Sequence, residues 1–179
     1  MNYRYDNRTK EEFSKNIKDA SILQSQMISL WKDEMLYKGL SVDIEDNGCD
    51  NSGGYLDKAS NAPDYRIRLL KGRSFSNDLY EVKTAPHYDK YYSFKVDSLT
   101  SCIYYNAYIL VFGGVAPNRP IDLDKLRWSI ISPQQTAQIL NTYPITTNGY
   151  LFGGKPIVQI PAKDFSKWFY LHKFDHLRN

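Results

Sequence analysis

Two short polar groups of residues stand 17 positions apart in this sequence. Asp64 is the first, and Glu81-Val82-Lys83 is the second, with a carboxylate and an ammonium two residues apart. Side chains alternate between the faces of a strand, so Glu81 and Lys83 would share a face while Val82 points into the core. If Asp64 lies beside Glu81, two carboxylates and the Val82 carbonyl form an oxygen-rich site suited to Mg²⁺. The lysine can then neutralise charge on a phosphate or assist an attacking water.

These groups must be positioned by strands, and the surrounding pattern predicts two of them. Residues 64–70 alternate in polarity, residues 71–73 contain a glycine flanked by cations, and residues 79–84 alternate again. This pattern is typical of two antiparallel strands joined by a tight turn. The turn brings the two polar groups toward each other.

A long helix is expected before the strands. Thr9 and Glu12 have the spacing of a capping box, and apolar residues recur every three or four positions from Phe13 to Met35. Gly39 is a natural C-terminal stop. One long helix, or two helices joined near residues 19–21, would both fit.

The rest of the chain alternates between helical and strand patterns. In order, these predict a helix over 98–104, a buried strand over 107–112, a strand over 126–131, a helix over 133–140 capped by Ser132, a hairpin formed by 150–152 and 156–160, and a helix over 163–173. We find no repeat and no long linker. The expected fold is a single mixed α/β domain over residues 1–179.

Composition excludes several classes of protein. The chain has 179 residues, two cysteines and a formal net charge of +3. Two cysteines are too few for a disulfide scaffold, and no apolar run is long enough to span a membrane. The first residues lack the apolar region of a secretory signal. We therefore expect a cytoplasmic protein with no membrane partner. The richness in Asn, Lys, Tyr, Ile and Ser is typical of an AT-rich genome, which indicates a bacterium or a phage-infected host. Nucleotide-binding loops and serine-hydrolase motifs are also absent from the sequence.

The pair Pro63-Asp64, followed by Glu81-Val82-Lys83, resembles the motif of the PD-(D/E)XK nuclease superfamily. The order of predicted elements over residues 13–112 also resembles the α-β-β-β-α-β core of that family. The resemblance implies a restriction-endonuclease-like fold, with a mixed central sheet flanked by helices. The alternative is an exposed Glu–Lys pair on one strand face, with Asp64 as an ordinary turn residue.

The resemblance also implies an activity. Asp64 and Glu81, with the Val82 carbonyl, would bind Mg²⁺, with Mn²⁺ as a substitute, and Lys83 would act in catalysis. The expected protein is a homodimeric endonuclease that hydrolyses DNA, of a type II restriction-like or a phage or junction-resolving type. A non-catalytic nucleic-acid-binding module of a recombination or repair complex is the alternative, and an RNA-directed nuclease is a third hypothesis.

Other residues are candidates for supporting roles. Many members of the family carry a further polar residue on the first helix, for which Gln24 and Glu34 are both candidates. Basic residues near the predicted strands are candidates for DNA contacts, namely Arg66, Arg68, His87, Lys90 and Lys95. The alternatives are a solvated strand edge for the arginines and an ordinary loop position for His87. The alternating lysines and aromatic residues of 88–95 either stack on bases or pack the core. His172 and His176 would share a face of the last helix, most simply a solvated one.

Overall fold

The computed structural model describes residues 10–47, 62–86, 89–117, 119–147 and 155–178. The main sheet has five strands in the order β1-β2-β3-β5-β6, with β3 and β5 parallel and the other neighbours antiparallel. Its strands are β1 (Ser41–Asp46), β2 (Tyr65–Lys71), β3 (Ser74–Ala85), β5 (Tyr108–Gly113) and β6 (Arg127–Ile131). The mixed α/β class predicted from the sequence is confirmed.

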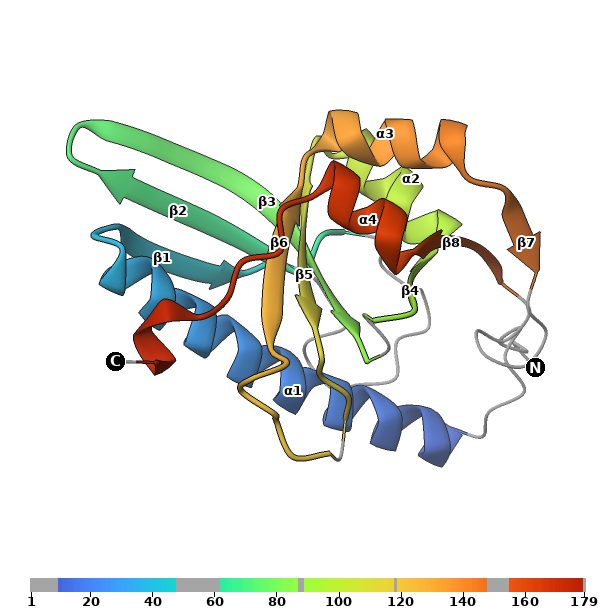
Figure 1. The fold of residues 1–179 in the computed structure, drawn as a ribbon, viewed down its shortest axis with the longest axis horizontal. Helices are drawn as coiled ribbons and strands as arrows, with labels where there is room; N and C mark the ends of the chain where they lie inside the picture. The colour runs from blue at the N-terminus through green and yellow to red at the C-terminus, as the bar shows by residue number, and fades with distance from the viewer. Residues whose placement is uncertain (1–9, 48–61, 87–88, 118, 148–154, 179) are drawn as a thin grey trace.

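Helices and a second sheet cover the main sheet on its two faces. Figure 1 shows α1 along one side, and α2, α3, α4 and the smaller sheet on the other. The smaller sheet has the order β4-β8-β7. These elements are α1 (Lys10–Tyr37), β4 (Tyr91–Lys95), α2 (Val96–Tyr104), α3 (Pro133–Thr142), β7 (Ile145–Thr147), β8 (Pro156–Pro161) and α4 (Ala162–Trp168). The chain order thus contains the α-β-β-β-α-β series expected from the resemblance, with β4 inserted before α2.

Local signals explain where two of the helices begin or end. The first helix is a single one over the described residues, and it ends before Gly39, whose φ of 78° suits a residue without a side chain. At α3, Ser132 and Gln135 form a complete capping box, as the sequence predicted for Ser132. Thr9 lies outside the described residues. Among those described, no helix combines the length and apolarity that a membrane span needs.

Strand β5 is the central element of the domain, because both of its faces are buried. Leu110 and Phe112 pack with α1 in a first core, whereas Ile109 and Val111 pack with α2 in a second core. The continuous apolar run over 107–112 predicted such a doubly covered strand, and this prediction is confirmed. The two faces of the neighbouring β3 also point toward different cores, and Val82 lies in the first core.

The last predicted helix is wrong in extent. It ends at Trp168 rather than at residue 173, and Phe169 continues in extended conformation. Phe169 is buried in the second core and Phe174 in the first, so the segment between them must run from one core to the other. An extended segment covers this distance, whereas a helix would hold both rings within one turn or two. Tertiary packing therefore overrides helix propensity here.

This extended segment separates the two histidines that the sequence placed on one helix. His172 forms a β-bridge with Trp128, and the two rings stack with centroids 4.2 Å apart. His176 lies in the 3₁₀ turn Asp175–Leu177 and bonds to Glu34 of α1. The hypothesis of a shared helix face is wrong, and both residues instead fasten the end of the chain to the domain.

Glu34 is a fully buried carboxylate that holds this turn. Its Oε2 accepts hydrogen bonds from the His176 backbone nitrogen at 3.0 Å, and lies 2.7 Å from His176 Nδ1. Lys38 Nζ lies 2.9 Å from Glu34 Oε1 and 2.6 Å from Asp175. Burial alone would raise the pKa of Glu34, but the hydrogen bonds from His176 and Lys38 outweigh it and lower the pKa to about 2.

We expect the variant Glu34→Gln to unfold more easily at neutral pH, by about 2–3 kcal/mol, because it removes one partner of a buried ion pair. The folded pKa lies below the ordinary value, so this stabilisation is complete above about pH 4.5 and is lost as the pH falls toward 2. Urea unfolding at pH 7 and pH 3 measures both effects. The difference between wild type and variant should shrink at pH 3, and a pH-independent difference would contradict the assignment. Asp122→Asn, at an exposed ion pair, is the control.

Candidate active site

The β2–β3 pairing brings the two polar groups of the sequence together. Tyr65 pairs with Tyr80, so Asp64, one residue before β2, lies beside Glu81. Asp64 Oδ2 accepts a hydrogen bond from the Val82 backbone nitrogen at 2.7 Å, which ties it to the centre of the Glu-Val-Lys group. Lys83 forms an ion pair with Glu81 on the same face, and Val82 points into the first core. The structure therefore joins all four residues in one patch.

This patch is recessed, unlike an ordinary charged pair on a strand surface. The side chains of Glu81 and Lys83 are 14% and 28% exposed, respectively. Exposed ion pairs contribute little and tolerate loss of either partner, whereas partly buried charges interact strongly. The burial favours a functional cluster over a solvated Glu–Lys pair.

The electrostatics of Asp64 follow from this crowding. Burial, and then the negative charge of Glu81, raise the pKa of Asp64 to about 7. Lys83 and the hydrogen bonds from Val82 and Gln24 act in the opposite direction but are outweighed. The site thus holds a carboxyl group that is poorly compensated when ionised. A cation would relieve this cost.

Lys83 remains positively charged in this environment. Burial would lower its pKa, but the carboxylates of Glu81 and Asp64 more than reverse this, and the pKa is raised. Cys102 of α2 is buried behind the cluster, and burial together with Glu81 raises its pKa to about 12. The thiol is therefore protonated at neutral pH, and its place in the second core is that of a packing residue.

Asn47, directly after β1, positions the residues that precede β2. Its side-chain Nδ2 donates to the Pro63 carbonyl at 3.0 Å, and its backbone nitrogen donates to the Asp64 carbonyl at 2.9 Å. These bonds fasten the end of β1 to the residue pair that precedes β2. In the sequence, this residue belongs to a turn-like Asp-Asn-Gly group at positions 46–48, whose partner cannot be known without the pairing of β1 with β2.

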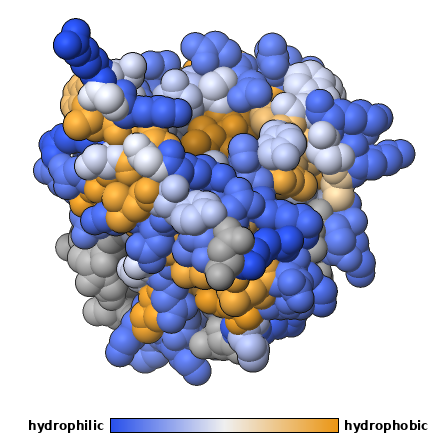
Figure 2. Space-filling view, turned by 60° about the vertical axis from the view of Figure 1, so that its left-hand side comes forward, coloured by the Kyte–Doolittle hydropathy of each residue, from blue (hydrophilic) through white to orange (hydrophobic). Residues whose placement is uncertain are grey.

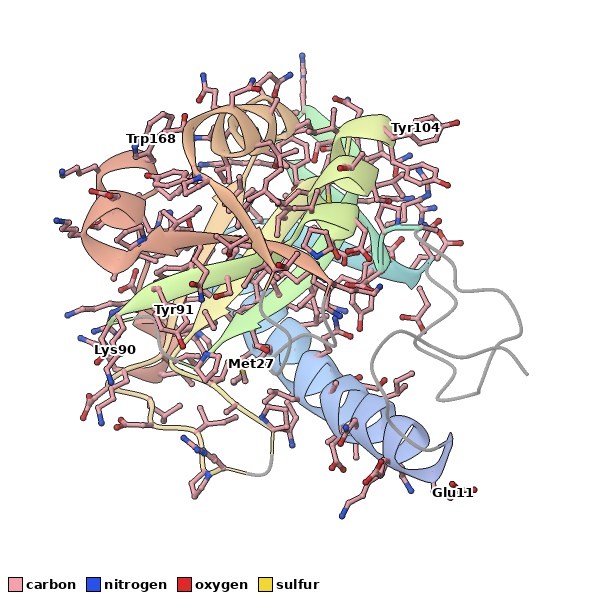
Figure 3. All side chains as sticks on the ribbon, turned by 90° about the vertical axis from the view of Figure 1, so that its right-hand side faces the viewer. Glu11, Met27, Lys90, Tyr91, Tyr104 and Trp168 are labelled. Carbon is pink, nitrogen blue, oxygen red and sulfur yellow. The ribbon has the colours of Figure 1, made fainter. Side chains whose placement is uncertain are left out.

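Of the two candidates on the first helix, the structure brings Gln24 to the cluster. Its Nε2 donates to Asp64 Oδ2 at 3.1 Å and to the Val82 carbonyl at 3.3 Å. It lies one turn from Met27, which Figure 3 shows where α1 meets the sheet. Glu34 is ten residues farther, about 15 Å along the helix, and bonds to His176 instead.

The proposed DNA-contacting residues lie in different settings. Arg68 is held by Asp43 at 2.6 Å and by Glu45 at 2.8 Å, so its charge is already compensated. Arg66 lies on the same face of β2 and is partly buried, and Lys95 is partly buried at the end of β4. Lys90 is exposed, and Figure 3 shows it next to Tyr91. His87 lies outside the described residues.

The aromatic residues of β4 pack the interior. Tyr92 and Phe94 are buried in the second core, and Tyr92 stacks on Phe165 with ring centroids 3.7 Å apart. Of the two alternatives for residues 88–95, core packing therefore holds for these two rings. They are not available for stacking on bases.

The oxygen atoms of the cluster are ligands of the kind that a hard divalent cation prefers. Asp64 Oδ2 and the Val82 carbonyl both converge on one hydrogen-bond donor, Gln24 Nε2, which shows that the two oxygens are directed at a common position. Glu81 adds a second carboxylate, and oxygen ligands of this kind suit Mg²⁺. In the part of the chain that the structure describes, there is no group of three or more His, Cys, Asp or Glu side chains placed to hold a metal. The site thus offers two carboxylates and one carbonyl.

We expect Gln24→Glu to bind Mn²⁺ more tightly than the wild type, by about tenfold, because an extra carboxylate replaces an amide donor. Without cation, the same variant should melt at a lower temperature, since it adds a third negative charge beside Asp64 and Glu81. Titration calorimetry and thermal melting with Mn²⁺ or EDTA measure these effects. Gln26→Glu, on the exposed side of the same helix, is the control and should change neither. Equal Mn²⁺ affinity of Gln24→Glu and wild type would contradict the placement of Gln24.

Comparisons with known proteins give fold similarity at a low level. No protein-family model matches the sequence, and no curated protein matches it. Among solved structures, the chain is similar to Hjc, a Holliday junction resolvase of Archaeoglobus fulgidus, with 12% identity and a TM-score of 0.41, over 87% of this chain and 99% of that one. It is also similar to D212, a nuclease from a fusselovirus, with 14% identity and a TM-score of 0.41, over 99% of this chain and 94% of that one. At these values, any statement about function depends on the geometry of the site.

Proposed function

We propose that this protein is a metal-dependent endonuclease that hydrolyses phosphodiester bonds of DNA. The observation that carries the proposal is the convergence of Asp64, Glu81, the Val82 carbonyl and Lys83 in one recessed patch. This is the set of groups that the resemblance to PD-(D/E)XK nucleases implies. The position of each group follows from the β2–β3 pairing and from strand alternation.

The residues of the patch have different roles in this proposal. Asp64, Glu81 and the Val82 carbonyl would hold Mg²⁺, which supplies Lewis-acid polarisation of a phosphoryl oxygen and activation of water when bound. Lys83, protonated because its pKa is raised, stabilises negative charge that develops on the phosphoryl group. In this proposal Lys83 therefore acts as an electrostatic catalyst. Gln24 orients Asp64 from the side of α1.

The substrate class in this proposal is DNA, in a restriction-like or junction-resolving role. A homodimer would bring two such patches to the two strands that a complete cut requires. Light scattering of the free protein and of its DNA complex measures this directly, and a monomer in both states would contradict the dimer.

Cleavage of supercoiled plasmid and of a four-way junction tests the proposed activity. We expect products that depend on Mg²⁺ or Mn²⁺ and disappear with EDTA. Discrete plasmid fragments would favour a restriction-like role, and symmetric cuts near a branch would favour junction resolution. DNA binding without cleavage at any cation concentration would overturn the nuclease in favour of a binding module. Preferential cleavage of structured RNA would change the substrate class.

A further inference from the structure

The β2–β3 hairpin extends one face of the sheet well beyond the candidate site. Figure 1 shows the hairpin projecting away from α2, α3 and α4, which cover the same sheet farther along. By strand alternation and the β2–β3 register, one face of the hairpin is shared by these residues, from the site to the tip: Lys83, Glu81, Leu79 with Arg66, Asn77 with Arg68, and Phe75 with Leu70. A polymer bound at the site can therefore continue along this face.

The tip of the hairpin carries two large apolar side chains that the fold does not bury. Phe75 is 64% exposed and Leu70 is 45% exposed, although the two residues are direct cross-strand partners. A cross-strand apolar pair stabilises a hairpin modestly, but this contact leaves most of the phenyl ring in water. Single exposed apolar residues are common on a protein surface, but this pair is adjacent and lies on the same face of the hairpin as the candidate site.

The charge at the tip selects the kind of partner. Residues 69–77 contain Lys71 and Arg73, both exposed, and no acidic residue. Farther down the same face, Arg68 is neutralised by Asp43 and Glu45. Neither Lys71 nor Arg73 forms an ion pair with another described residue, so uncompensated positive charge accompanies the apolar pair at the tip. This combination is complementary to a polyanion with apolar faces, which is the chemistry of nucleic acid.

The hairpin is also built to hold its tip in place. Lys71 pairs with Ser74, so only Gly72 and Arg73 form the turn, and Gly72 has a φ of 59°. A glycine at positive φ in the first central position is typical of a tight type II′ hairpin. Phe75 lies six positions from Glu81 along the extended strand, a reach of about 20 Å. This reach exceeds the width of a DNA major groove, about 12 Å, so the tip and the candidate site can contact different parts of one DNA molecule.

We propose that Leu70 and Phe75 form a stacking wedge for unpaired or unstacked bases, and that Lys71 and Arg73 hold the adjacent phosphates. The proposal deepens the proposed function and rests on it, since it makes branched, mismatched or partly single-stranded DNA the preferred substrate. Apolar side chains inserted at a base step, and rings stacked on single bases, both act in this way. Figure 2 turns the hairpin end forward and shows separate apolar areas among hydrophilic ones, rather than one continuous apolar surface suited to a second protein.

A four-way junction with 2-aminopurine at the branch point, and a linear duplex of the same arm sequence, test the wedge. Binding is measured in Ca²⁺ to prevent cleavage, and cleavage is then started with Mg²⁺. Phe75→Ser should weaken junction binding about tenfold and remove the 2-aminopurine fluorescence change, with less than a twofold effect on the duplex. Phe75→Trp should restore both signals. Tyr104→Ser, which removes a ring that is 82% exposed elsewhere, is the control and should behave as wild type.

The outcomes separate this inference from the function on which it rests. Cleavage of neither DNA by the wild type would overturn the proposed function itself. Cleavage of the junction by wild type and by Phe75→Ser at equal rates, with equal fluorescence, would overturn the wedge alone. A change from dimer to monomer in Phe75→Ser by sedimentation, with unchanged fluorescence, would also overturn it, because the tip would then contact a second copy of this chain.

Discussion

Replacing Lys83 with methionine should reduce the rate of DNA cleavage by about 10²–10³-fold. Methionine keeps much of the length of the side chain but removes the charge that we assign to stabilising the phosphoryl group. The ammonium is paired with Glu81 and its pKa is raised, so the variant removes a positive charge from the patch. Single-turnover rates at saturating enzyme measure the chemical step separately from binding.

Two further variants make this result specific. Lys83→Arg keeps the charge but not its shape, so it should retain part of the activity. Lys125→Met removes a lysine from an exposed ion pair with Asp122 and should leave the rate unchanged. A pH–rate profile provides a second readout. If Lys83 acted as a general base, the profile would contain its ionisation near neutrality, and the assignment as an electrostatic catalyst would fail.

Asp64→Asn should abolish cleavage and weaken Mn²⁺ binding at least about 100-fold, yet stabilise the cation-free protein. Cleavage and Mn²⁺ binding are lost because an amide replaces a carboxylate where two oxygens converge on one position. The higher stability of the cation-free protein follows from the pKa of Asp64, which burial and Glu81 raise to about 7. Asparagine can still accept the hydrogen bond from the Val82 nitrogen, but it has no charge to bury.

The sign of the stability effect is set by proton binding. The folded pKa of Asp64 lies above its ordinary value of 3.8, so the folded protein holds this proton more tightly than the unfolded one. Its contribution to the free energy of unfolding therefore falls as the pH rises from about 4 to about 7. At pH 8 in EDTA, Asp64→Asn should be more stable than wild type by about 2–4 kcal/mol, a difference that diminishes at pH 4. Equal stability at both values would contradict the burial of an uncompensated charge.

Sequence patterns were sufficient for the candidate cluster because its geometry is local. Asp64 and Glu81 lie on either side of one hairpin, so a tight turn and strand alternation already place them together. The central strand was equally clear, since a doubly covered strand needs a continuous apolar run. The sequence named Gln24 and Glu34 as candidates but could not decide between them, because the choice depends on how α1 lies across the sheet, which sequence spacing within α1 does not encode.

The end of the chain shows the opposite case. Residues 163–173 have a helical pattern, but their aromatic residues are divided between two cores on opposite sides of the sheet. No local signal distinguishes a ring that packs under its own helix from one that must reach the other core. The partner of Glu34 was likewise hidden, since His176 is 142 residues away in sequence.

The fastening of residues 172–176 to the domain has a consequence for the order of events during synthesis. Among the described residues, α1 emerges from the ribosome before the strands, whereas Phe174, which stacks with Phe112, and His176, which bonds to Glu34, emerge almost last. Until residues 172–176 have been made, the growing chain therefore holds an open first core and a carboxylate that lacks its histidine partner. The domain that carries the candidate site becomes complete only when this short segment has been made.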